Sequence, residues 1–228
     1  MTEAGREQRY SKVAIWLHWL TAVPVLFNLA TGLSFSLMSN ALFGALIPFH
    51  ISSGVTVLAL TLVRIVWRLT HKRPPLLPMP AWQKGLANLT YLLFYVALIA
   101  GPVTGWVLIS AHADHPVPAA GAPATAKPMA PGVAPPPKPH RTLIWGVVPL
   151  PKLAPVAALG KGPGGAAKLH TVHEQFEGRH ETIGWVLLGL LLLHVSGALK
   201  HQLIDRRREL ARMGLGRPEP AGTGAQRR

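Results

Sequence analysis

Residues 180–201, HETIGWVLLGLLLLHVSGALKH, decide how this chain folds. The part from Thr182 to Leu199 carries no charged residue, and about 18 apolar residues are enough to cross a bilayer as a helix. The stretch nevertheless has a histidine at its start, His180, and a second one deep inside, His194. Ionisable side chains at membrane depth are costly and usually mark a functional path. These two histidines are therefore the first candidates for a functional site.

The rest of the chain predicts three more membrane spans. Of its 228 residues, 49% are hydrophobic and 14% charged, which is typical of an integral membrane protein. Residues 13–63 carry no charge but are interrupted by turn-forming residues between 39 and 48, so they predict spans at 13–38 and 50–69. Residues 85–111 and 182–199 predict the other two. The expected fold is all-α, a bundle of four transmembrane helices.

The distribution of lysine and arginine predicts that both termini are cytoplasmic. These residues number three in the tail 1–12, none in 39–49, four in 68–84 and eight from Lys200 onward. Basic residues accumulate on the cytoplasmic side, whereas a long loop such as 112–179 is translocated largely regardless of its charge. The formal charge of +14 then reflects topology and attraction to anionic lipid, and we expect no nucleic-acid partner.

We expect one membrane domain, residues 1–205, followed by a basic and partly disordered tail, 206–228. The outer loop contains an insertion at 116–139, rich in proline, alanine and glycine, that has no apolar period and predicts an extended linker. The more apolar residues 141–153 are expected on the membrane surface, with Trp145 among the lipid headgroups. We predict that six further histidines lie in loops, where they are exposed to solvent and bind metal at most incidentally: His71, His112, His115, His140, His170 and His173.

Four other histidines fall at two depths in the predicted bundle. His50 and His180 begin the second and fourth spans on the outer side, and His18 lies near the inner end of the first span. His194 follows His180 by 14 residues, which is about 21 Å along a helix and within about 40° of the same face. The depths therefore pair His50 with His180 outside and His18 with His194 inside.

Paired imidazoles in a membrane predict a metal cofactor. Neutral imidazole is the commonest metal ligand among side chains. The chain has no cysteine, which excludes covalently attached c-type haem and disfavours iron–sulfur clusters. We therefore predict two non-covalent b haems, each with one histidine pair as axial ligands. A single histidine at a helix end is more often an interfacial residue, but four at matched depths favour haem.

Small and basic residues close to the histidines are compatible with a flat cofactor. Gly54, Gly184 and Gly197 lie three or four residues after a candidate ligand, where the missing side chain would let a porphyrin approach the backbone. Glycines at such spacing also pack membrane helices against each other. Arg64 and Arg68, one turn apart, either pair with haem propionates or reach lipid phosphates at the inner boundary.

Four motifs together resemble the bacterial cytochrome b561 family: YSKVAIWLHWL, HISSGVTVLALTLVRIVWRL, GLANLTYLLFYVALIAGPVTGW and RHETIGWVLLGLLLLHVSGALKHQ. The resemblance covers all four predicted helices and leaves out the loops and tails. It implies a multi-pass cytochrome of the bacterial inner membrane whose two b haems are held by His18, His50, His180 and His194. It also implies electron exchange with ubiquinone, and members similar to this chain oxidise superoxide at the outer face.

The chain departs from the family pattern in two places. Asn88 and Tyr91 stand where the third helix of the family often carries histidines, and the 116–139 insertion changes the outer surface. His201 lies seven residues past His194, hence on the same face and about 10 Å nearer the cytoplasm. Beside Lys200 it occupies a place that resembles a quinone contact in the family. The alternative is a snorkelling Lys-His pair at the interface.

Two functions of different classes remain open from the sequence. The first is a di-haem oxidoreductase that moves electrons between the outer side, where superoxide is a candidate donor attracted by the basic loop, and the ubiquinone pool. The second is a cytochrome b subunit that anchors a periplasmic or membrane redox partner and conducts its electrons. A partner subunit that co-purifies with the chain would distinguish them.

Overall fold

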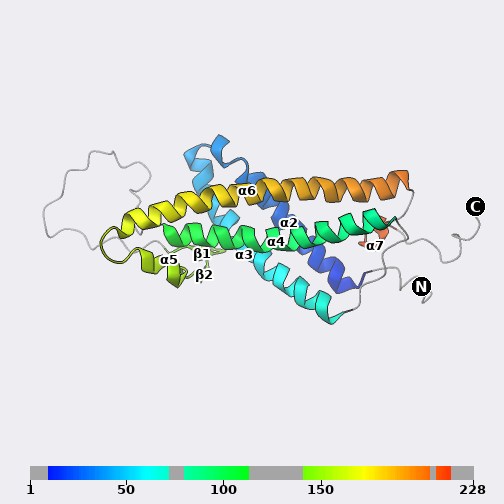
Figure 1. Cartoon of the computed structure of the whole chain (residues 1–228), viewed down its shortest axis with the longest axis horizontal. Coiled ribbons are helices and arrows are strands. Elements are labelled where there is room, and N and C mark those ends of the chain that lie inside the picture. The colour runs from blue at the N-terminus through cyan, green and yellow to red at the C-terminus, as the bar shows by residue number, and fades with distance from the viewer. Residues whose placement is uncertain (1–9, 72–79, 113–140, 206–208, 217–228) are drawn as a thin grey trace, which may run out of the picture.

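Four long helices make up most of the structure. The computed structural model describes residues 10–71, 80–112, 141–205 and 209–216, and in them four helices are long and apolar enough to cross a membrane (Figure 1). These helices are α2 (Lys12–Gly32), α3 (Asn40–Thr70), α4 (Ala81–Ala111) and α6 (Gly165–Leu199). The predicted all-α bundle of four spanning helices is confirmed.

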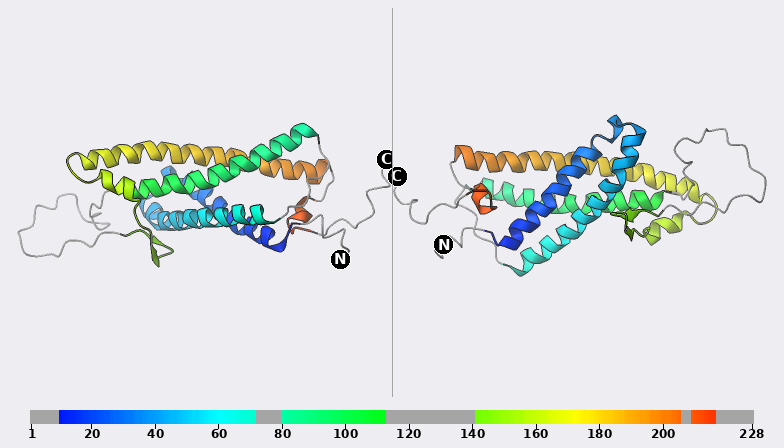
Figure 2. Two further views of the ribbon diagram at one scale, coloured as in Figure 1. Left: turned by 60° about the horizontal axis from the view of Figure 1, so that its bottom comes forward. Right: turned by 180° about the vertical axis from the view of Figure 1, so that it is seen from behind.

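The helices form two packed layers around a small apolar core. Helices α4 and α6 run side by side, and α2 and α3 cross one face of that pair (Figure 2). The buried core contains Val25, Leu29, Val57 and Leu98, and Leu33 just after α2 and three leucines of α6 pack against it. Val25 and Val57 each follow a candidate histidine by seven residues, so the core lies between the two histidine depths.

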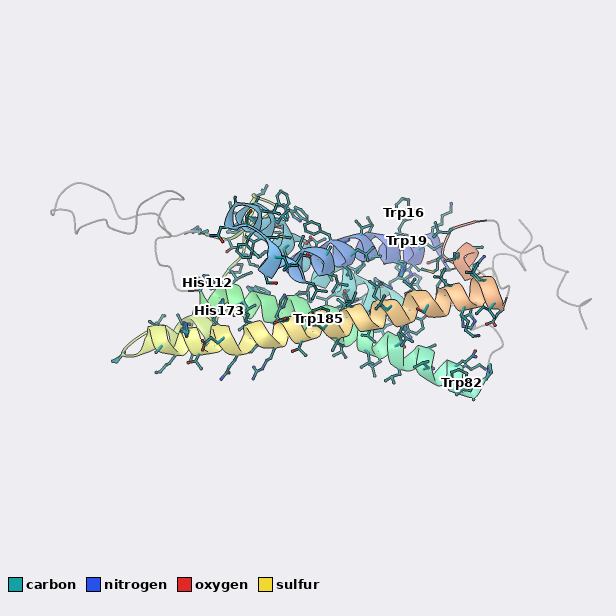
Figure 3. The ribbon with its side chains drawn as sticks, turned by 90° about the horizontal axis from the view of Figure 1, so that it is seen from above. Trp16, Trp19, Trp82, His112, His173 and Trp185 are labelled. Carbon is teal, nitrogen blue, oxygen red and sulfur yellow. The ribbon has the colours of Figure 1, made fainter. Side chains whose placement is uncertain are left out.

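The outside of the bundle is apolar, as expected for a surface that faces lipid. Trp16, Trp82 and Trp185 are 66%, 67% and 55% exposed and project from three different helices (Figure 3). Many leucines and valines of the four helices are also exposed. A soluble monomer rarely shows so much contiguous apolar surface, and tryptophan is enriched where membrane proteins meet the lipid interface.

Two helix ends near the predicted first loop differ from the sequence-based boundaries. Helix α2 ends at Gly32 instead of 38, and the short 3-10 helix η1 (Phe35–Leu37) follows it. Helix α3 begins at Asn40 instead of 50, because the Ser39 side chain caps it and Pro48 is accommodated inside the helix. A proline is tolerated within a membrane helix when its surroundings satisfy the freed backbone groups, so it was a poor boundary signal here.

Two further helices begin earlier than predicted. Helix α4 begins at Ala81 instead of 85, and α6 begins at Gly165, far before the predicted residue 182. His170 and His173 therefore lie on a helix and not in a loop, and each forms an i,i+4 pair with a glutamate. Such pairs stabilise a polar helix. The hydropathy pattern missed it because this part of α6 carries no apolar run.

The segment predicted to lie on the membrane surface folds back onto the bundle. It forms an antiparallel hairpin of β1 (Leu143–Ile144) and β2 (Val148–Pro149), followed by the short helix α5 (Ala154–Leu159). Trp145 at the hairpin tip donates hydrogen bonds from its backbone N–H to Ser52 Oγ at 2.9 Å and from Nε1 to Thr56 Oγ1 at 3.1 Å. The hairpin is thus attached to α3 one turn beyond His50.

Part of the predicted tail also packs against the bundle. Helix α7 (Glu209–Arg212) lies at the same end as the start of α2 (Figure 1). Trp19 Nε1 donates a hydrogen bond to the Met213 carbonyl at 3.0 Å, and the Arg212 guanidinium lies 5.7 Å from the centre of the Tyr10 ring. The 116–139 insertion, residues 206–208 and residues 217–228 lie outside the described residues.

Candidate functional site

The structure brings the four candidate histidines together as two pairs. The imidazole rings of His50 on α3 and His180 on α6 have centroids 6.2 Å apart, with an angle of 74° between their planes. The rings of His18 on α2 and His194 on α6 are also 6.2 Å apart, at 53°. All four side chains are half-buried in the bundle. Helix α6 contributes one imidazole to each pair, and the apolar core separates the pairs.

The spacing within each pair suits two imidazoles on opposite sides of one metal ion. A ligating ring nitrogen lies about 1.2 Å from its ring centroid, and metal–imidazole bonds are about 2.0–2.1 Å long. Two trans ligands therefore place their ring centroids roughly 6.4–6.6 Å apart. The 6.2 Å of both pairs agrees with this value to within a few tenths of an ångström.

Hydrogen bonds set the tautomer of His50. The Thr31 hydroxyl donates its proton to the Phe27 carbonyl at 2.8 Å and lies 2.9 Å from His50 Nδ1. Since a hydroxyl has one proton to donate, His50 Nδ1 is the donor in the second contact. The proton of the neutral ring is then on Nδ1, and Nε2 keeps the lone pair that a metal requires.

His180 has the same tautomer for a similar reason. Its Nδ1 lies 3.0 Å from the Gly101 carbonyl, which can only accept, and 3.0 Å from Thr104 Oγ1. Metal-ligating histidines almost always donate their other ring N–H to a carbonyl or carboxylate group. Both members of this pair therefore present an unprotonated Nε2, and the donor set fits a haem iron held by two neutral imidazoles.

The His18–His194 pair has a basic and aromatic environment. Arg64 Nη2 lies 3.5 Å from His18 Nδ1, while Phe94 stands edge-on to His194 at 5.6 Å. The Thr61 hydroxyl, one turn before Arg64, is buried and has no hydrogen-bond partner among the described residues. This end of the bundle thus contains a guanidinium and an unpaired hydroxyl, two polar groups that a haem propionate could satisfy.

The second predicted arginine has other partners. The Arg68 guanidinium lies over the rings of Tyr91 and Tyr95 on α4, 5.4 and 5.6 Å from their centroids. Such contacts are favourable cation–π interactions. Tyr91, which stands where the family often has a histidine, thus interacts with Arg68, and only Arg64 directly reaches a candidate ligand.

The glycines that contact the imidazoles are not those predicted. A Cβ added at Gly32 would meet His50 Cε1 at 3.0 Å, and one at Gly105 would meet His180 Cε1 at 3.2 Å. A Cβ added at Gly54 or Gly184 would come into ordinary contact with Asn28 or Leu33, and one at Gly197 would meet no atom within 4 Å. Their predicted role, to leave room for a porphyrin, stays a prediction. Sequence spacing missed Gly32 and Gly105 because they lie on helices other than those of the histidines they contact.

The predicted quinone contacts lie in a distorted turn at the end of α6. Residues Lys200–Ile204 form the π-helix η2, so the α-helical register used to place His201 does not hold there. Asp205 Oδ2 accepts hydrogen bonds from Lys200 Nζ at 2.8 Å and from His201 Nδ1 at 2.6 Å. The hydrogen bond from Lys200, then that from His201, holds the pKa of Asp205 below its usual value. The sequence analysis did not identify Asp205 as part of this group. The π-helical turn is itself a signal, because such turns are frequent at functional sites.

A four-helix membrane bundle with two histidine pairs stacked across it has the form of an electron-transfer cytochrome. The family model described as prokaryotic cytochrome b561 matches residues 9–216, and the chain belongs to this family. Membership identifies it as a membrane electron carrier and implies that it binds haem b.

Several curated relatives carry the same family name or a related one. Cytochrome b561 homolog 2 of Escherichia coli K12 is 24% identical over 218 residues, which cover 93% of this chain and 95% of that protein. Cytochrome b561 homolog 1 of the same organism is 28% identical over 108 residues, 45% of this chain and 60% of the relative. The probable superoxide oxidase CybB of Yersinia pestis is 26% identical over 103 residues, 45% of this chain and 58% of the relative.

The glycine contacts generate the first prediction. Gly32→Ala should displace His50 and weaken the spectral component of the His50–His180 pair, because the added methyl group lies at only 3.0 Å from the ring and overpacking costs about 1–3 kcal/mol. Gly105→Ala should act in the same direction but less strongly. The control is Gly189→Ala on α6, whose added methyl group would meet no atom within 4 Å. Unchanged haem spectra in both test variants would contradict the assignment.

The Nδ1 hydrogen bonds generate the second prediction. Thr31→Val keeps the side-chain shape but removes the one hydrogen-bond partner that His50 Nδ1 has among the described residues, and loss of such a partner typically costs about 10–100-fold in metal affinity. Thr104→Val should cost less, because the Gly101 carbonyl remains bound to His180 Nδ1. Haem retention in purified protein and midpoint potentials from redox titration measure both effects. Equal effects of the two substitutions would show that the hydrogen bonds do not act as described.

Proposed function

We propose that this chain holds two b haems and carries electrons from a donor at the His50–His180 end to ubiquinone at the His18–His194 end. The observation that carries the proposal is the geometry of the pairs. Both have a centroid spacing at which two imidazoles would hold one metal ion, and the Nδ1 atoms of His50 and His180 are held by residues of α2 and α4. When bound, haem iron supplies one-electron chemistry at each pair.

The side chains around the pairs have separate roles in this function. Thr31 and Thr104 hold His50 and His180 in the ligating tautomer, and the apolar core keeps water out of the layer between the pairs. A guanidinium only donates hydrogen bonds, so Arg64 cannot be the partner of a ligating His18, whose Nδ1 carries the proton. We expect Arg64 to pair with a propionate instead, and its positive charge beside this pair favours the reduced state there.

We assign the His50–His180 end to the outer side, in agreement with the distribution of basic residues. At this end the described chain carries Lys161 and Lys168 as exposed side chains and Lys152 as a half-exposed one. A basic surface raises the local concentration of a small anion, and a relative bears the name probable superoxide oxidase. Superoxide is therefore the donor we propose, each anion losing one electron to become dioxygen.

We place the quinone at the opposite end, beside Lys200 and His201. Reduction of ubiquinone to ubiquinol takes two electrons and two protons, so two superoxide anions are consumed for each quinone. Asp205 holds the His201 proton on Nδ1, and in the described part of the chain the Nε2 of this ring makes no hydrogen bond. Nε2 then keeps a lone pair that accepts a hydrogen bond from a ubiquinol hydroxyl, while the Lys200 ammonium donates to a quinone carbonyl. Lys200 with Asp205 provides a proton-exchanging pair beside this ring.

A second function, electron conduction for a partner protein, is supported by the shape of the outer end. Helix α6 begins 15 residues before His180, α5 packs against α4 and α6, and the hairpin packs on α3. This folded surface outside the membrane could hold a redox subunit. A stoichiometric subunit in purified material, together with slow reduction by superoxide, would favour this function over direct oxidation of superoxide.

The third prediction concerns the haem content and the identity of the ligands. The purified chain should contain two low-spin b haems that acid acetone extracts, because no thioether link can form without cysteine. His50→Ala and His180→Ala should remove one spectral component, and His18→Ala and His194→Ala the other. One haem per chain would disprove the arrangement, and so would loss of the same spectral component in His50→Ala and His194→Ala. Absorption spectra and the haem-to-polypeptide ratio are the measurements.

The fourth prediction concerns the two half-reactions. A superoxide-generating system should reduce the protein, and salt should slow this step because attraction between exposed charges is screened over about 8–10 Å at near-physiological ionic strength. A ubiquinone analogue should then reoxidise it with little dependence on salt. Reduction no faster than that of an unrelated b cytochrome would favour the partner-conduit function.

Variants separate the quinone step from the haem sites. His201→Ala should slow reoxidation by quinone at least several-fold while both haem spectra persist, because the ring lies beyond the axial positions. Asp205→Asn should slow the same step, since an amide can no longer hold both Lys200 and His201 by charge-assisted hydrogen bonds. If reoxidation is unchanged in both variants, these residues form an ordinary interfacial cluster and the quinone binds elsewhere.

A further inference from the structure

Two histidines outside the haem pairs meet at the outer end of the bundle. His112 follows the last residue of α4, and His173 lies in the part of α6 that projects beyond the predicted span (Figure 3). Their ring centroids are 4.9 Å apart, with an angle of 66° between the planes. Sequence spacing does not indicate this pairing, because the two positions are 61 apart in residue number.

The ring spacing of His112 and His173 is shorter than that of the His50–His180 and His18–His194 pairs, and it suits a different coordination geometry. With a ring nitrogen about 1.2 Å from the centroid and bonds of about 2.0–2.1 Å, two imidazoles at 90–110° on one metal have centroids roughly 4.5–5.4 Å apart. Trans ligands would require roughly 6.4–6.6 Å. The 4.9 Å between His112 and His173 therefore fits two neighbouring ligands of a tetrahedral or square-planar ion.

Hydrogen bonds fix the backbone of His112, and His173 lies on a helix. The His112 carbonyl accepts a hydrogen bond from Lys152 Nζ at 2.8 Å, and the His112 N–H donates to the Leu108 carbonyl at 3.2 Å. His173 is turned inward, with 28% of its side chain exposed, whereas 73% of the His170 side chain is exposed one turn away. Glu177 Oε2 lies 3.9 Å from His173 Nδ1, beyond hydrogen-bond distance, and its negative charge on this side of the ring is complementary to a bound cation.

We infer that His112 and His173 form a surface site for a divalent transition-metal ion that prefers imidazole, Cu²⁺ or Zn²⁺. Calcium and magnesium are excluded as occupants because they need several oxygen ligands, and the ammonium group of Lys152 lies close by. In the described part of the chain no third histidine, carboxylate or cysteine completes a metal cluster, so water fills the remaining positions. By the usual order of affinities Cu²⁺ binds more tightly than Zn²⁺.

A metal at this site would join the end of α4 to α6 above the outer histidine pair. His173 precedes His180 by seven residues, which places it on nearly the same helix face and about 10 Å further out. The bridge would fix the two helices that carry Gly101, Thr104 and His180. The inference does not rest on the proposed superoxide or quinone chemistry, because it concerns metal binding alone.

The test uses the haem-loaded full chain without a polyhistidine tag. Titration with Zn²⁺ followed by calorimetry should show one site per chain, and His112→Ala and His173→Ala should each weaken it at least about tenfold, as loss of one of two protein ligands requires. His170→Ala is the matched control, because this exposed residue lies on the same helix and pairs with Glu174. Unaltered Zn²⁺ affinity in both test variants would overturn the inference.

Spectroscopy with Cu²⁺ gives an independent test of the ligands. The electron paramagnetic resonance spectrum of the chain with one equivalent of Cu²⁺ should show coupling to two imidazole nitrogens in the wild type and in His170→Ala. It should show coupling to at most one in His112→Ala and His173→Ala. Both haem spectra must be unchanged in every variant, which establishes that the fold is intact. A wild-type signal from one nitrogen, or from none, would refute the two-histidine site.

Discussion

The requirement that a buried imidazole have partners on both ring nitrogens organises this protein. At His50 and His180 a threonine hydroxyl or a backbone carbonyl accepts the Nδ1 proton, which leaves the Nε2 lone pair for a metal. Those acceptors lie on α2 and α4, while the histidines lie on α3 and α6. A single pair therefore involves all four helices, and the way the helices cross follows from it.

The two histidine pairs differ in ways that suit different ends of an electron path. The His50–His180 pair has neutral hydrogen-bond partners and close glycine contacts from Gly32 and Gly105. The His18–His194 pair lies beside the positive charge of Arg64 and a buried hydroxyl without a partner among the described residues. A cation near a redox centre favours its reduced state, and electrons would then move toward the end where Lys200, His201 and Asp205 are gathered.

Structure beyond the membrane spans adds contacts that composition did not predict. The hairpin is attached to α3 through Trp145, and the Met213 carbonyl is bound by Trp19. The polar start of α6 places His173 against His112. These parts have no long apolar run, so hydropathy cannot detect them, and their positions depend on single hydrogen bonds and ring contacts to the bundle.

The sequence by itself determined the class of fold. Uncharged apolar stretches of this length partition into the bilayer, where a helix satisfies the backbone N–H and C=O groups within the segment itself. The sequence also predicted which histidines pair, since the 14-residue spacing of His180 and His194 on one helix sets both face and depth. Tertiary structure alone decided what surrounds them. Gly32, Gly105 and Thr31 contact imidazoles of other helices, and no regular spacing along the chain records a contact between helices. Asp205 and the π-turn before it, likewise, follow from local hydrogen bonding that interrupts the helical period on which the sequence argument relied.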